Sequence, residues 1–100
     1  MISKKAINKI KEINSLIKEV DRSDEKSNNY AFLSMKEHIE EIKELFLKKD
    51  QHWAEETIDL LIHCILLLER NGYQIKEINR IFKVRCERFK EKISNQFEKK

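Results

Sequence analysis

Residues 59–72, with the sequence DLLIHCILLLERNG, give the first indication of the fold. Between Asp59 and Glu69 the residues are apolar on every side of a helix, with His63 as the one interruption. Asn71 and Gly72 then predict the end of the helix, because glycine readily adopts the left-handed conformation found there. The apolar run is much shorter than the roughly 20 residues that span a bilayer. It therefore predicts a buried central helix, with no transmembrane segment.

Apolar residues also recur at intervals of three and four on both sides of this stretch, which is typical of amphipathic helices. Ser23 and Asp24 can cap a new helix start, and Asp50 can cap the next one after Lys48 and Lys49. The pattern predicts four helices, over about 2–20, 24–49, 51–70 and 75–93. In the second of them, the expected core stripe consists of Ala31, Met35, Ile39, Ile42 and Phe46.

The composition agrees with an all-α protein, since the 100 residues include no proline and a single glycine. Four helices with short connections predict one domain over residues 1–100, an antiparallel four-helix bundle. A chain this short is near the lower limit for a self-sufficient core. We therefore expect a homodimer or a dimer of dimers.

Charge and cysteine content exclude several classes of protein. The net charge of +3 comes from 21 basic and 18 acidic residues spread along the chain, so no basic block predicts nucleic-acid binding. The first 16 residues lack the apolar core of a secretory signal, which predicts a cytoplasmic protein without membrane attachment. Cys64 and Cys86 have no CxxC spacing and are expected to be small buried hydrophobic residues.

Acidic residues mark two of the predicted helices. On the second helix, Glu37, Glu40 and Glu44 follow one another at helical spacing between two leucines, and like charges so placed repel unless a cation lies among them. On the third helix, Glu56 and Asp59 are one turn apart, and an aspartate in an enclosed helix needs a partner or a metal. Mg²⁺ prefers oxygen ligands of this kind. The sequence therefore predicts a magnesium site made of Glu37, Glu40, Glu56 and Asp59.

The same residues carry a family resemblance. Glu37-x-x-Glu40, fifteen residues, and Glu56-x-x-Asp59 resemble the ExxE and ExxD motifs of the MazG-like all-α nucleoside triphosphate pyrophosphohydrolases. The apolar helix that follows, up to Gly72, is similar to that of MazG-like proteins and of phosphoribosyl-ATP pyrophosphohydrolases. The likeness covers about residues 31–89. It departs from the family pattern at Lys36, where many members carry glutamate, and at Cys86, where asparagine is frequent.

The resemblance implies Mg²⁺-dependent hydrolysis of a nucleoside triphosphate between the α- and β-phosphates, which releases the monophosphate and pyrophosphate. Glu41 and Glu44 are then candidates for accepting the proton of the attacking water. Lys83 and Arg85 are candidates for binding the polyphosphate.

Two alternatives stay open at this point. One is a phosphoribosyl-ATP pyrophosphohydrolase, favoured by the stretch Ile62-His63-Cys64, although the first half of the chain lacks the expected glycine-containing segment. The other is a catalytically silent helical module that binds a protein, which the missing acid at Lys36 would permit. Among the histidines, His38 and His52 are expected at the surface, whereas His63 is expected in the core or beside a ligand carboxylate.

Overall fold

The computed structural model describes residues 2–98, which form four helices and no strands. Helix α1 spans Lys4–Asp21, α2 spans Asp24–Leu47, α3 spans Trp53–Arg70 and α4 spans Ile75–Glu98. The predicted all-α class and the four helices are confirmed. Along this part of the chain, no helix is long and apolar enough to cross a membrane.

The helix ends follow the local sequence. The Ser23 side chain accepts a hydrogen bond from the backbone N–H of Lys26 and so caps α2, as predicted. Gly72 has a φ of 95°, a left-handed conformation, and the N–H of Tyr73 donates back to the carbonyl of Leu68. Asp50, however, is not the N-cap of α3. Its carboxylate accepts the N–H of His52 and so closes the turn before the helix, which begins later than expected.

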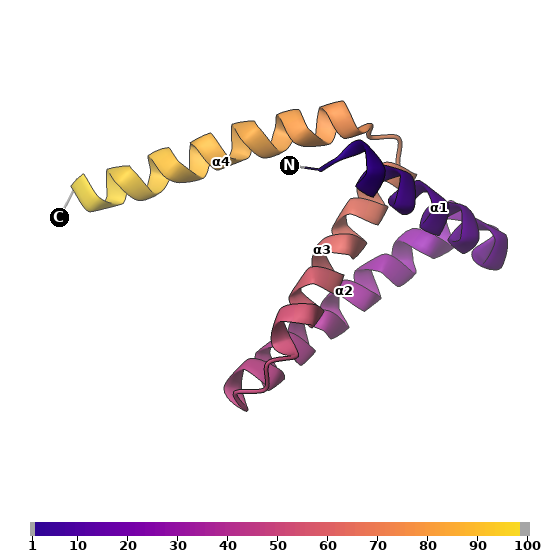
Figure 1. Cartoon of the computed structure of the whole chain (residues 1–100), viewed down its shortest axis with the longest axis horizontal. Helices are drawn as coiled ribbons and strands as arrows, with labels where there is room; N and C mark the ends of the chain where they lie inside the picture. The colour runs from indigo at the N-terminus through magenta and orange to yellow at the C-terminus, as the bar shows by residue number, and fades with distance from the viewer. Residues whose placement is uncertain (1, 99–100) are drawn as a thin grey trace.

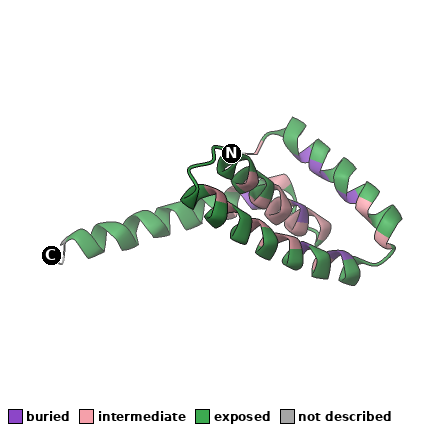
Figure 2. Ribbon diagram, turned by 90° about the horizontal axis from the view of Figure 1, so that it is seen from below, coloured by how far each residue is buried: buried purple, intermediate pink, exposed green. Residues whose placement is uncertain are grey.

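The helices are unequally packed. Helices α2 and α3 form a hairpin whose two arms make most of the interhelical contacts, and α1 packs across its open end (Figure 1). Helix α4 takes part in this bundle only with its first turns and then projects away, exposed along the remainder of its length (Figure 2). The radius of gyration is 16.3 Å, against about 13 Å for a compact domain of this size. The four predicted helices therefore do not close into one compact bundle within a single chain.

The core lies where α1, the second half of α3 and the start of α4 meet. Its buried residues are Ile7, Ile10, Leu66 and Ile78. The expectation that α3 is buried on every side is wrong for a single chain, since Leu66 is its one buried residue and Ile58 and Leu61 are exposed. The cysteines are not buried either, because Cys64 is half-buried and Cys86 is exposed. Helix α3 and its Cys64 are incompletely covered because no helix within residues 2–98 packs on the outer side of α3. Cys86 is exposed because it lies on the part of α4 that projects from the bundle.

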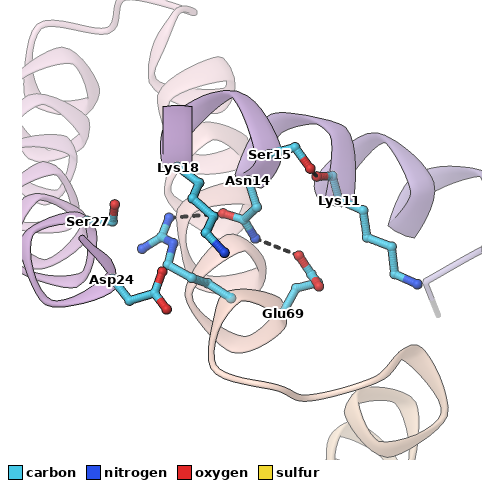
Figure 3. Close-up of a pocket in the computed structure, with 8 residues that line it drawn as sticks. Lys11, Asn14, Ser15, Lys18, Asp24, Ser27 and Glu69 are labelled. Carbon is cyan, nitrogen blue, oxygen red and sulfur yellow. Dashed lines mark hydrogen bonds between the residues drawn. The ribbon is translucent and has the colours of Figure 1, made fainter. Parts of the chain in front are cut away.

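A buried asparagine connects α1 to the end of α3 (Figure 3). Asn14 is 8% exposed, and its amide donates to the Leu66 carbonyl at 3.0 Å and to the Glu69 carboxylate at 2.9 Å. Its own oxygen accepts a hydrogen bond from the guanidinium of Arg70 at 3.1 Å. The amide nitrogen and the amide oxygen of Asn14 are therefore both hydrogen-bonded, and these bonds fix the position of α1 on the hairpin.

We expect Asn14→Ala to lower the free energy of unfolding by about 2 to 3 kcal/mol, because the buried Leu66 carbonyl and the half-buried Glu69 and Arg70 side chains each lose a hydrogen bond. Urea unfolding followed by circular dichroism measures this change. Ser15→Ala is the matched control, since the exposed Ser15 hydroxyl donates only to the Lys11 carbonyl of its own helix, and its cost should be under about 0.5 kcal/mol. Equal costs for the two variants would contradict the assignment of Asn14 as the connection between α1 and α3.

Candidate functional site on the α2–α3 hairpin

The face of α2 that packs against α3 differs from the predicted stripe. Ala31 is buried and Met35 and Ile42 are half-buried, as expected, but Ile39 and Phe46 are exposed. The shielded residues in this register are Ala31, Met35, His38, Ile42 and Leu45. The spacing of three and four residues thus runs through His38, and the expectation that His38 is a surface residue is wrong.

His38 contacts Glu56 across the hairpin. The Nδ1 atom of His38 lies 2.6 Å from Oε2 of Glu56, and the side chains are only 20% and 25% exposed. A carboxylate can only accept a hydrogen bond, so Nδ1 carries the proton in this pair and donates it. The contact joins the middle of α2 to the first turns of α3.

Asp59 joins this pair from the next turn of α3. One potential ligand atom from each of His38, Glu56 and Asp59 lies within 4.8 Å of the others. Asp59 is exposed, which corrects the expectation that it is enclosed by the bundle. The three side chains therefore form a cluster with one open side, which we call the hairpin cluster.

A fourth side chain, Glu41, interacts with Glu56 of the cluster. Hydrogen bonding to Glu56, followed by the charge of Glu56, raises the pKa of Glu41 above its usual value. Glu56 shifts in the opposite direction, because hydrogen bonds from His38 and then from Glu41 lower its pKa. Glu41 is thus the carboxyl group that holds a proton most readily, and Glu56 is the one that stays ionised.

His63 packs against the His38 ring of the hairpin cluster. Its ring centroid is 5.1 Å from that of His38, with the two rings tilted by 37°. Burial is the main cause that lowers the pKa of His63, and the neighbouring His38 adds to it. His63 is therefore a neutral, half-buried ring that packs against His38, consistent with one of the two roles expected for it.

The other predicted site residues of α2 are the metal ligands Glu37 and Glu40 and the proton acceptor Glu44, and they lie outside this group. Glu37 and Glu40 are exposed and do not belong to the three-residue cluster, although the charge of Glu37 contributes to the raised pKa of Glu41. Glu44 pairs instead with Lys48 of its own helix at 2.8 Å, and this pairing lowers the pKa of Glu44. Two of the four predicted metal ligands, Glu56 and Asp59, are thus brought together with His38.

The predicted phosphate-binding residues are on α4. Lys83 borders a shallow hollow of about 430 Å³, together with residues of the same helix, and the guanidinium of Arg85 lies 5.5 Å from the centre of the Phe89 ring. Because α4 leads away from the α2–α3 hairpin (Figure 1), a single chain does not bring these cations to the hairpin cluster.

The cluster can hold a divalent cation. Mg²⁺ is commonly bound by one or two carboxylates together with the phosphates of a substrate, and Glu56 and Asp59 meet that requirement. No protein-family model, curated protein or solved structure matches the chain.

Proposed function

We propose that the chain is a Mg²⁺-dependent nucleoside triphosphate pyrophosphohydrolase of the MazG-like type, which cleaves between the α- and β-phosphates. The observation that supports this proposal is the juxtaposition of Glu56 and Asp59 at the open side of the hairpin cluster. Both acids belong to the ExxD motif that carries the resemblance. In this proposal they bind the ion together with the other two predicted ligands, the exposed Glu37 and Glu40 of α2.

A bound divalent ion would neutralise phosphate charge and lower the pKa of a water molecule. Glu41 is the best candidate for receiving the proton of that water, because its raised pKa makes its carboxylate a stronger base than an ordinary glutamate. Glu44 is the weaker candidate, since its carboxylate is held by Lys48. Water has free access to the acids from the side on which Asp59 is exposed.

The proposal includes a homodimer or a dimer of dimers. The chain exposes 8412 Å², whereas a compact monomer of 12.1 kDa exposes about 6,000 Å². The excess of about 2,400 Å² is larger than the roughly 800 Å² that each partner covers in a standard interface. In an assembly, Lys83 and Arg85 of one copy can lie close to the phosphates bound by another, because α4 of one copy can reach the hairpin of the next.

One observation favours a second candidate, the silent helical module. The Glu56 carboxylate is already satisfied by His38 and Glu41, so the hairpin does not require an ion to be stable. Metal binding separates the two candidates, because an ion that binds only the folded state raises the melting temperature. The enzyme should melt higher in Mg²⁺ than in chelator, and the silent module should melt at the same temperature in both.

Pyrophosphate release tests the proposed function itself. The protein is incubated with canonical and modified nucleoside triphosphates and with phosphoribosyl-ATP, in Mg²⁺ and in chelator. We expect Mg²⁺-dependent release from at least one nucleoside triphosphate. Release from phosphoribosyl-ATP alone would favour the alternative enzyme, and no release from any compound would favour the silent module.

A further inference from the structure

We infer that His38, Glu56 and Asp59 form a binding site for a divalent transition-metal ion of the Mn²⁺ to Zn²⁺ series, with one imidazole nitrogen and two carboxylate oxygens as ligands. The imidazole nitrogen that binds the ion releases any proton that it carries to the solvent. The inference rests on the proposed function, because both concern the same site, and it specifies which ion that site binds. Its own basis is the position of His38, which occupies one of the unspecified positions of the ExxE motif and is not among the ligands that the resemblance implies.

The donor atoms indicate the class of ion. Mg²⁺ selects oxygen ligands, whereas an imidazole nitrogen suits Zn²⁺, Co²⁺ and related ions. The affinity of a mixed nitrogen and oxygen site rises along the series from Mn²⁺ through Co²⁺. A set of one nitrogen and two oxygens therefore binds these ions more tightly than two oxygens alone, while it gives Mg²⁺ little additional affinity.

The distances are compatible with such a site. Bonds from such an ion to nitrogen or carboxylate oxygen are about 2.0 to 2.2 Å, so two ligands of one ion lie at most about 4.4 Å apart. The three potential ligand atoms already lie within 4.8 Å of one another. The exposed Asp59 side chain can rotate, so that small adjustments bring the three atoms to bonding distance of one ion. The open side then leaves further coordination positions for water or phosphate oxygens.

His38 is also held in position, which favours a role beyond that of a surface residue. Its ring is bounded by Glu56 at 2.6 Å and by the His63 ring at 5.1 Å, and its side chain is largely shielded between the two helices. A ring fixed in this way loses little freedom on binding an ion. The plain alternative is that His38 and Glu56 form only a hydrogen bond that stabilises the hairpin.

Calorimetric titration of metal-free protein with CoCl₂ and with MgCl₂, in the absence of nucleotide, tests the inference. The wild type should bind Co²⁺ at least about 10-fold more tightly than Mg²⁺. His38→Gln should weaken Co²⁺ binding at least about 10-fold more than it weakens Mg²⁺ binding, because the glutamine amide can still donate a hydrogen bond to Glu56 but supplies no nitrogen ligand. The visible spectrum of the Co²⁺ protein should change in the same variant.

His52→Gln is the matched control, because His52 is an exposed histidine of the same hairpin that pairs with Asp50 at 2.8 Å. It should leave Co²⁺ binding unchanged. Circular dichroism checks that each variant is folded. Unchanged Co²⁺ affinity in a folded His38→Gln protein, equal losses in both variants, or a wild type that prefers Mg²⁺ would overturn the inference.

These outcomes are independent of catalysis. Co²⁺ binding through His38 without pyrophosphate release from any nucleotide would leave the metal site standing and refute the proposed function. Pyrophosphate release in Mg²⁺ together with Co²⁺ binding that is unchanged in His38→Gln would support the proposed function and refute the metal site.

Discussion

Asp59→Asn is expected to abolish both Mg²⁺ binding and pyrophosphate release while leaving the helices folded. The substitution keeps the shape of the side chain but removes one of the two carboxylates that the hairpin cluster offers to an ion. Loss of a residue that merely supports a metal ligand costs about 10- to 100-fold, so loss of a ligand should cost at least about 100-fold. The metal-free variant should be no less stable than the wild type, because Asp59 is exposed and lies close to Glu56.

Glu55→Gln provides the matched control, since it removes the same charge from an exposed position of α3 outside the cluster. Mg²⁺ titration and pyrophosphate release are measured on both variants, with circular dichroism as the check on folding. An active wild type together with an Asp59→Asn protein of undiminished activity would refute the assignment of these acids.

Ile93→Lys is expected to convert the proposed dimer into a monomer. Ile93 belongs to the apolar stripe of α4 and is 52% exposed, and Phe82 and Phe89 on the same stripe are also exposed. In a symmetric dimer one substitution changes both halves of the interface, and each buried lysine lacks a partner. Residues at the centre of an interface contribute at least about 2 kcal/mol each, so the dissociation constant should rise by a factor of about 1,000.

Val84→Lys is the control on the same helix, because Val84 is 43% exposed but lies on the opposite side from the stripe. Light scattering at micromolar concentration should give a dimer or tetramer for the wild type and for Val84→Lys. A monomeric wild type would contradict the assembly, and an Ile93→Lys protein that remains dimeric would exclude the α4 stripe as its interface.

Local signals in the sequence are sufficient to predict the helices but not how the helices pack into a bundle. Ser23 and Gly72 act through hydrogen bonds and φ angles within a few residues, so the ends of α2 and α3 could be predicted closely. The direction of α4 depends on what covers its apolar stripe. Periodicity reveals that Phe82, Phe89 and Ile93 need a partner, but it cannot tell a helix of the same chain from a helix of another.

The site could be predicted in part for a similar reason. Glu56 and Asp59 are one turn apart on a single helix, so their proximity follows from helical geometry alone. His38 meets them from another helix, and its position depends on which face of α2 turns toward α3. The spacing places His38 on the core side, because it follows Ala31 by two helical turns, whereas hydrophobicity favours Ile39 and Phe46 for the core. Both of them are exposed in the structure.

The products formed from the most reactive nucleoside triphosphate test the proposed function most directly. Phosphorus NMR of a completed reaction distinguishes the bond that is broken. We expect nucleoside monophosphate and pyrophosphate in equal amounts in Mg²⁺ and unchanged triphosphate in chelator. Nucleoside diphosphate with inorganic phosphate, or triphosphate that remains intact in Mg²⁺, would contradict the assignment.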